Sequence, residues 1–249
     1  MSKTIVFQPI DKKRYFEQIA DMIRVKIFQE NLREGYRLPS EQQFATELGV
    51  SRSVVREALR ILDVMGYVEI RKGPQGGIFV SSLYHKPLSD SFRNLAESGQ
   101  ITVEHLFDVR LHVEPLIVME AVKYASDEDI NKIVGLMKDA GEHLDEGAYL
   151  KQKNIEFHFL LAEASGNPVL AILMKSLIEI LIEVAYSFLN PAFEKELYHV
   201  HDDLLKAIKN RKINEAVKLV HDDILFVKEN LTKSIKKDKT QKSAMRIKP

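Results

Sequence analysis

Side chains that could hold a ligand are spaced one helical turn apart in the second half of the chain. Asn154 and His158 stand four residues apart in the largely apolar run NIEFHFLL. Residues at that spacing share one face of a helix and can contact the same ligand. An imidazole nitrogen paired with an oxygen donor suits a divalent metal. Because the chain of 249 residues has no cysteine, only His, Asp, Glu or Asn could hold such a metal.

The phase of two later helices brings further polar side chains to buried faces. In one helix that face is set by four apolar residues, Leu197, Leu204, Leu205 and Ile208. His201 shares the face, whereas His199 points away from it. In the next helix Asp223 falls within the apolar stripe of Ile213, Ala216, Val220 and Val227. We therefore expect His201 and Asp223 to face inward, with His221, one edge over, as the alternative to Asp223.

Two simpler interpretations stand beside the metal site. Arg110 and Glu114 lie four residues apart among apolar residues, and such a pair is commonly a helical ion pair worth about a few tenths of a kcal/mol. The inward-facing polar residues could also form a hydrogen-bonded cluster without metal, because buried polar groups need partners. Both interpretations predict a polar cavity.

A second group of polar residues lies in the first half of the chain. Ser51, Arg52, Ser53 and Arg56 stand at the beginning of a predicted helix, and Lys72 and Gly73 lie in a glycine-rich turn. Arginine can donate two hydrogen bonds to a guanine edge, and hydroxyl groups can reach phosphate or base. Taken alone, the arginines of this helix also fit the solvated face of an amphipathic helix.

The elements around these residues form a known arrangement. Apolar spacing predicts a helix over 15–29, and Ser40 caps a short helix over 41–48 that ends at Gly49. A third helix runs from about 52 to 65. Alternating strands over 67–71 and 78–80 then flank the glycine-rich turn. Helix, turn, helix and hairpin in this order predict a winged helix-turn-helix, whose second helix enters the major groove of DNA.

The remainder of the chain predicts a second domain. Residues 102–231 consist of amphipathic segments with breaks at Ser126, near Gly147, at Gly166–Pro168, at Asn190–Pro191 and around Asn210. We therefore expect a mainly α protein with a winged helix-turn-helix over 1–82, a linker over 83–100 and an all-α antiparallel bundle over 101–231. The lysine-rich segment 232–249 has few large apolar residues and is predicted to be disordered.

Composition limits the classes of function. No apolar run approaches the roughly 18 residues that cross a bilayer, and the first residues lack a secretory signal, so we expect a cytoplasmic protein with no membrane contact. Residues 1–82 contain 13 Lys and Arg against 10 Asp and Glu, and residues 228–249 contain 8 against 2. Residues 83–227 contain 15 Lys and Arg against 24 Asp and Glu. Such asymmetry fits contact with a polyanion.

Metal-assisted hydrolysis is disfavoured by the attached DNA-binding unit, and we expect no enzyme activity.

The segment LPSEQQFATELGVSRSVVREALRILDVMGYVEIRKGPQGGIFV resembles the DNA-binding motif of the GntR superfamily, and with the preceding helix the resemblance covers residues 11–82. It implies a set of DNA-binding residues: Ser40, Gln42, Ser51, Arg52, Ser53, Arg56, Lys72 and Gly73. Family members often carry Arg at the position of Gln42. We therefore expect an altered preference for the DNA site.

The second half resembles the FCD effector domain of FadR-type GntR regulators, through DVR with Glu114, FH with ASGNP, and His201. The resemblance implies a divalent metal in a ligand pocket, held by an Asp, a His four residues later and two further His. These positions are occupied here by Asn154, His158, His201 and Asp223, so that two of the four ligands are exchanged. Zn, Mn and Ni remain chemically compatible with this set.

The resemblance further implies how the protein works. A homodimer would bind a palindromic operator, and a small organic acid would bind at the four metal positions with its carboxylate clamped by Arg110, relieving repression. The alternative is a DNA-binding regulator or architectural protein with a metal-free polar pocket and no response to a small molecule.

Overall fold

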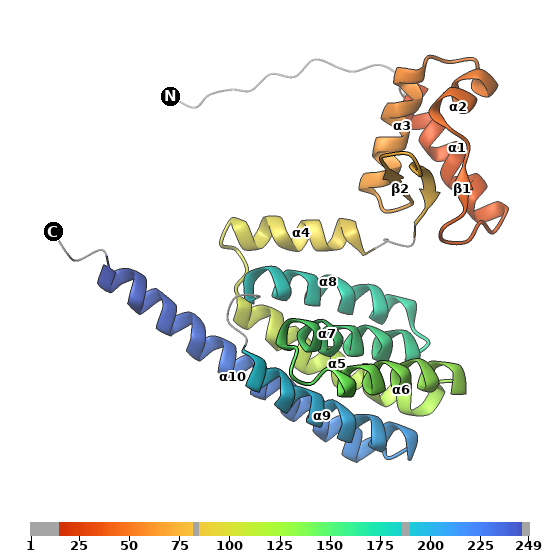
Figure 1. Ribbon diagram of the computed structural model, residues 1–249. Helices are drawn as coiled ribbons and strands as arrows, with labels where there is room; N and C mark the ends of the chain where they lie inside the picture. Colours follow the sequence, from red (N-terminus) through yellow and green to blue (C-terminus); the bar gives the residue numbers. More distant parts are fainter. Residues whose placement is uncertain (1–14, 82–84, 186–189, 246–249) are drawn as a thin grey trace. The chain divides into compact units, whose positions relative to one another are not determined.

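The computed structural model describes residues 15–81, 85–185 and 190–245. The chain divides into two units, Met1–Pro87 and Leu88–Pro249 (Figure 1). The described residues are mainly helical, with one small antiparallel sheet in the first unit, so the predicted fold class is confirmed.

Three helices form the body of the first unit: α1 (Tyr15–Gln29), α2 (Glu41–Leu48) and α3 (Arg52–Val64). Ser40 caps α2 through a capping box with Gln43, and Gly49 ends it in the left-handed conformation at φ 63°. Apolar stripes of α1 and α3 face each other in the core, which contains Ile19, Ile23, Ile27, Val55, Leu59 and Leu62. These helix bounds match the predicted ones to within one residue.

The sheet contains β1 (Arg37–Leu38), β2 (Val68–Arg71) and β3 (Gly77–Val80) in the order β1-β3-β2, with both pairings antiparallel. Strand β1 was not predicted, because two residues before a proline carry no alternation. The turn between β2 and β3 depends on Gly76: a Cβ there would lie 2.4 Å from the backbone oxygen of Arg71. Val68 of β2 and Ile78 and Val80 of β3 lie in the same core as α1 and α3, and this packing holds the hairpin against the helices.

The second unit is all-helical. Its helices are α4 (Lys86–Glu97), α5 (Val103–Tyr124), α6 (Asp127–Glu142), α7 (Gly147–Ala164), α8 (Pro168–Ala185), α9 (Pro191–Lys209) and α10 (Ile213–Met245). The predicted breaks are confirmed, since Ser126 caps α6, α7 begins at Gly147, α8 at Pro168, α9 at Pro191, and Asn210 ends α9. None of the described helices has the length and apolarity needed to cross a membrane.

Two segments are more regular than the sequence predicts. The expected linker contains α4, which Ser89 and Arg93 tie to Glu179 and Glu183 of α8 at 2.6 to 2.8 Å. The expected disordered tail is helical through Met245. Lys, Gln and Ala are good helix formers, and α10 is already ordered by its packing against α5 and α9. Extending an existing helix avoids the cost of nucleation.

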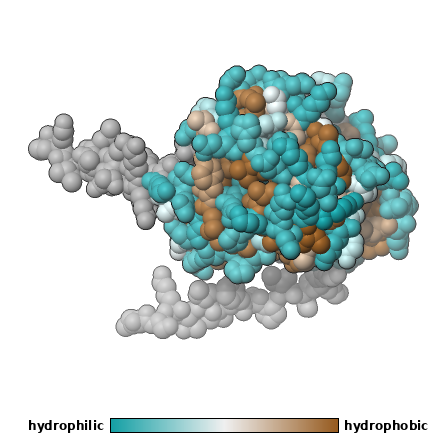
Figure 2. Space-filling view, turned by 90° about the horizontal axis from the view of Figure 1, so that it is seen from below, coloured by the Kyte–Doolittle hydropathy of each residue, from teal (hydrophilic) through white to brown (hydrophobic). Residues whose placement is uncertain are grey.

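Helix α7 lies at the centre of the bundle, packed against α5, α6, α8 and α9. Its buried residues include Phe157 and Leu161 as well as Asn154 and His158. On the face of the molecule shown in Figure 2, hydrophilic residues cover most of the surface and hydrophobic ones form separate patches. Inside the bundle, Asn154 and His158 lie on the same buried face of α7 as Phe157 and Leu161.

Candidate nucleic-acid interface and metal centre

Packing of α3 fixes which of its side chains face outward. Val55, Leu59 and Leu62 are at most 1% exposed. Their burial leaves Arg52, Ser53, Arg56 and Arg60 on the exposed face, as the helical period requires. On the same helix, Oε2 of Glu57 lies 3.7 Å from Nη1 of Arg60 and forms an ion pair with it.

The serines at the two helix starts act as caps. Ser51 accepts a hydrogen bond from the backbone N–H of Val54 at 3.4 Å, and its Oγ lies 2.9 Å from Oγ of Ser53. Ser40 accepts from the N–H of Gln43 at 3.3 Å. Both helix starts are exposed. Capping therefore fixes the backbone at the same positions that the resemblance assigns to DNA contact.

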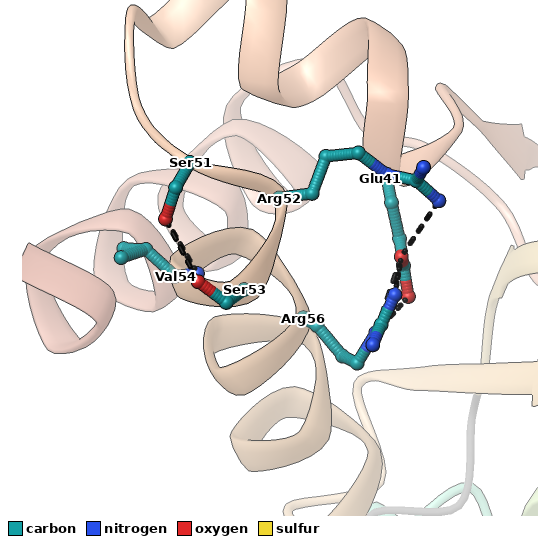
Figure 3. Close-up of polar contacts among 6 residues, drawn as sticks. All are labelled: Glu41, Ser51, Arg52, Ser53, Val54 and Arg56. Carbon is teal, nitrogen blue, oxygen red and sulfur yellow. Dashed lines mark hydrogen bonds and ion pairs between the residues drawn. The ribbon is translucent and has the colours of Figure 1, made fainter.

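Glu41 organises the arginines of α3 (Figure 3). Arg56 donates to both carboxylate oxygens of Glu41, at 2.8 Å from Nη2 to Oε2 and 3.0 Å from Nε to Oε1, and Arg52 lies 3.7 Å from Oε2. The hydrogen bond from Arg56 lowers the pKa of Glu41. Sequence reasoning missed this residue, because Glu41 and Arg56 are 15 positions apart.

The other predicted DNA-binding residues are exposed. Lys72 and Gly73 lie in the turn after β2, and Gly73 has a φ of 99°. Gln42 is exposed on α2. Beside the turn, Arg71 stacks 4.5 Å from the ring centre of Phe79 and pairs with Glu69 at 2.7 Å. The hairpin thus presents a cation and a flexible backbone position at its tip.

A cavity of about 80 Å³ lies inside the helical unit. Its polar lining comes from α5, α7 and α9: Arg110, Lys151, Asn154, His158, Glu194 and His201. Apolar residues of α5, α7, α8, α9 and α10 complete the wall, Ile178, Leu181 and Val227 among them. The volume has room for on the order of five water molecules, or for a small organic molecule.

Three of the predicted ligands converge beside this cavity. His158, His201 and Asp223 each offer one donor atom, and these atoms lie within 4.8 Å of one another. Oδ2 of Asp223 is 3.6 Å from Nε2 of His158 and 3.7 Å from Nε2 of His201, too long for hydrogen bonds. Burial lowers the pKa of His201 more than the neighbouring Asp223 raises it. Its imidazole is therefore neutral, as a metal ligand must be.

Glu114 lies behind His158. Its Oε2 is 2.8 Å from Nδ1 of His158, and its Oε1 accepts a hydrogen bond from Arg110. Burial raises the pKa of Glu114, but Arg110 and His158 together lower it to about 2. The carboxylate can thus orient the imidazole so that Nε2 faces Asp223. Arg110 lines the cavity while paired with this carboxylate.

The remaining predicted ligands have other neighbours. The side-chain amide of Asn154 donates to the backbone oxygen of Glu194 at 3.0 Å and to its Oε2 at 2.7 Å. Burial raises the pKa of Glu194. His221, the alternative ligand, is about half exposed and lies 3.7 Å from Asp222, so it does not belong to the buried group. Glu194 stands outside every motif, so no sequence pattern predicted its position in this site.

Comparisons with known proteins identify the family of each of the two units. The model "Bacterial regulatory proteins, gntR family" matches residues 16–80, and the model "FCD domain" matches residues 105–225. The HTH-type transcriptional repressor NanR of Klebsiella aerogenes is 29% identical over 223 residues, which cover 84% of this chain and 82% of that protein. NanR of Salmonella schwarzengrund is 28% identical over 211 residues, covering 82% and 76%.

A solved structure is also similar. Streptococcus agalactiae GntR superimposes with a TM-score of 0.61 and 25% identity, covering 86% of this chain and 99% of that one. Together the two family models span the helix-turn-helix unit and most of the helical unit. This chain is therefore a DNA-binding transcriptional regulator of the GntR family, with an N-terminal GntR domain and a C-terminal FCD domain, and not an enzyme.

Proposed function

We propose that this regulator represses transcription from a palindromic operator and senses a small carboxylic acid through a divalent metal held by His158, His201 and Asp223. The observation that carries the proposal is a set of buried ligand atoms with nothing to bind. Among the described residues, both ring nitrogens of His201 and both oxygens of Asp223 lack a hydrogen-bond partner. Each such group costs about 1–3 kcal/mol unless a partner is supplied.

A cation fits the spacing of these atoms. Zinc binds imidazole nitrogen at about 2.0–2.1 Å, so neighbouring ligands of a tetrahedral site stand roughly 3.4 Å apart. The observed separations of 3.6 and 3.7 Å lie close to that value. We therefore assign Nε2 of His158, Nε2 of His201 and Oδ2 of Asp223 as ligands. When bound, the metal would supply a positive charge that a carboxylate oxygen can coordinate.

Asn154 is the candidate for a fourth ligand. Its amide nitrogen is committed to Glu194, which leaves Oδ1 as the atom that can face a cation. Asn is a neutral and weak ligand. The site is consequently less negative than one with Asp at this position, and we expect weaker metal affinity than the usual ligand set would give.

The charges around the cavity disfavour binding of a carboxylic acid unless a metal is bound. Arg110 is paired with Glu114, Lys151 faces the charge of Glu194, and Asp223 is a further buried carboxylate. Apart from the imidazoles, this set has no surplus positive charge. A carboxylate would therefore be repelled until a divalent cation is bound. The proposed role of Arg110 is to hold Glu114 and to complete the polar wall rather than to act as an independent clamp.

For the DNA-binding unit we propose that Arg52 and Arg56 reach base edges, that Ser40, Ser51 and Ser53 contact phosphate or base, and that Lys72 follows the minor groove. A single winged helix covers one half-site, so we propose a homodimer on a two-fold operator. What supports these assignments is the exposure of the residues at the starts of α2 and α3 and at one hairpin tip.

The experiment is a comparison of acid binding with and without metal. Thermal shift is measured for a panel of small carboxylates on the chelated protein and on the same protein reloaded with Zn²⁺. We expect the acid to stabilise only the reloaded protein. In a gel shift with an operator selected from random sequence, we expect the acid to release the reloaded protein from DNA. The matched control is His199→Ala, which changes an exposed histidine of α9. Acid binding that is equally strong in the chelated protein would contradict the proposal.

A further inference from the structure

The turn of the hairpin is rich in glycine, and Lys72 lies at its start. Residues 73–77 read Gly-Pro-Gln-Gly-Gly. Within the turn, the backbone N–H of Gly76 donates a hydrogen bond to the carbonyl oxygen of Gly73 at 2.9 Å. Glycine loses more backbone freedom on ordering than any other residue. A turn with three glycines is therefore costly to order, and contacts from outside the turn are needed to hold it.

Arg37 supplies such a contact from another strand. It lies on β1, at the edge of the sheet, where its Cα pairs with that of Phe79 on β3. Its Nη2 donates a hydrogen bond to the carbonyl oxygen of Gly76 at 2.9 Å, across 39 positions of sequence. Its guanidinium carbon lies 5.9 Å from the ring centre of Phe79, within the range of a cation–π contact. Arg37 thus bridges the edge strand and the turn.

The guanidinium group of Arg37 fits closely against the end of the turn. A Cβ on Gly77 would lie 3.0 Å from Nε of Arg37 and 3.4 Å from its Nη2. The first distance is shorter than an ordinary contact between non-bonded atoms, so a larger residue at position 77 would displace the arginine. A planar guanidinium can lie against a ring and donate in its own plane, whereas a lysine ammonium has the charge without the plane. The position therefore uses the shape of arginine as well as its charge.

We propose that Arg37 is a positioning residue for DNA binding, which holds the glycine-rich turn in the conformation that brings Lys72 to the minor groove. This inference rests on the proposed contact between Lys72 and DNA. Arg37 is exposed, so it can be replaced without opening the core. A turn that is already ordered in the free protein has less conformational freedom to lose when DNA binds, and the complex is tighter for that reason.

The first test compares operator affinity by fluorescence titration of the full-length wild type, Arg37→Ala and Arg37→Lys. We expect Arg37→Ala to weaken binding about three- to tenfold, the effect of one hydrogen bond, and Arg37→Lys to recover little of the loss. Arg33→Ala is the matched control, because it removes the same charge from an exposed residue before β1, and it should change the affinity less than about twofold. Full binding by Arg37→Lys would show that charge alone matters and would overturn the inference.

The second test asks whether Arg37 acts through Lys72. In a Lys72→Ala background, Arg37→Ala should change the operator affinity less than about twofold, because residues that act as one unit are not additive. An equal loss in both backgrounds would mean that Arg37 contacts DNA by itself and would overturn the inference. If Lys72→Ala weakened binding and Arg37→Ala did not, only the role of Arg37 would be overturned. If Lys72→Ala had no effect, the proposed contact of Lys72 would be contradicted, and the role of Arg37 with it.

The third test examines the turn without DNA. The chain has 11 glycines, so labelling with ¹⁵N-glycine gives a simple NMR spectrum in which Gly76 and Gly77 report on the turn. We expect backbone order parameters of about 0.8 in the wild type and below about 0.6 in Arg37→Ala. Gly49, which ends α2, is the internal reference and should not change. Equal order parameters for the turn in both proteins would overturn the inference, since the turn would then be ordered without Arg37.

Discussion

Replacing Asp223 by Asn should stabilise the metal-free protein and abolish its stabilisation by metal. Asp223 is 1% exposed, and neither carboxylate oxygen has a hydrogen-bond partner among the described residues. A buried charge without a partner is unfavourable, and Asn has nearly the same shape without the charge. We expect the free energy of unfolding in chelator to rise by about 1–3 kcal/mol, the cost of an unsatisfied buried group.

Metal should stabilise the wild-type protein and leave the stability of Asp223→Asn almost unchanged. Zn²⁺ at about 100 times its Kd stabilises a folded protein by about 2.7 kcal/mol, and about 1 kcal/mol shifts the Tm of a domain of this size by roughly 2–4 °C. The wild-type protein should therefore gain roughly 5–10 °C on Zn²⁺ loading, and Asp223→Asn should gain almost nothing. The measurement is calorimetric melting at pH 8, where His201, whose pKa is lowered by burial, is neutral.

Asp222→Asn is the matched control. Asp222 is the neighbouring residue, about half exposed and paired with Lys218 at 2.9 Å. Surface substitutions of this kind change stability by about 0.5 kcal/mol or less. The reasoning would be refuted if Asp223→Asn destabilised the chelated protein by more than Asp222→Asn does. That result would mean that the buried carboxylate already has a partner and does not wait for a cation.

Three further predictions concern the first unit. Arg52→Ala should weaken binding to a selected operator by about 1–3 kcal/mol per lost base contact and leave binding to random DNA nearly unchanged in a fluorescence titration; equal loss on both DNAs would show that Arg52 contacts only phosphate. Glu41→Gln removes the carboxylate that holds Arg56 at 2.8 Å, so the affinity for random DNA should rise and the ratio of specific to random affinity should fall in the same titration; an unchanged ratio would show that Glu41 does not position the arginine. Leu59→Ala, at a residue with 0% exposure, should lower the free energy of unfolding by about 2–5 kcal/mol in a denaturant titration, and a loss below about 1 kcal/mol would contradict the packing of α3.

Local signals in the sequence predicted most of the fold. Capping residues such as Ser40 and Ser126, and breaks such as Pro168, fix helix ends through contacts within a few residues of themselves. Helix phase placed His201 and Asp223 on buried faces, because the apolar residues around them must face the core. These rules use short-range geometry, which the sequence displays directly.

Partners distant in sequence could not be predicted in the same way. Glu41 meets Arg56 only because α2 packs against α3. Glu194 reaches Asn154 across 40 positions of sequence, and neither acid belongs to a motif. Strand β1 forms only because β3 provides an edge for it. Pairing across the fold depends on how elements pack, and a single sequence carries no direct record of that packing.

The role of Arg110 was a further limit. Its spacing from Glu114 fitted both a helical ion pair and a ligand clamp. The structure buries the pair and adds His158 to it, and this third member changes the chemistry: the carboxylate that holds Arg110 also orients a candidate metal ligand. Burial and the third partner are properties of the bundle.

The account depends most directly on whether the protein holds a metal at the buried histidines. Three proteins are purified without chelator: the wild type, His158→Ala/His201→Ala and His199→Ala. Their metal content is measured by mass spectrometry, and measured again after incubation with Zn²⁺, Mn²⁺ or Ni²⁺ and desalting. We predict about one divalent metal per chain in the wild type and in His199→Ala, and none in the double variant. Wild-type protein that retains no metal after incubation, or a double variant that retains as much as the wild type, would contradict the claim that His158, His201 and Asp223 form a metal centre.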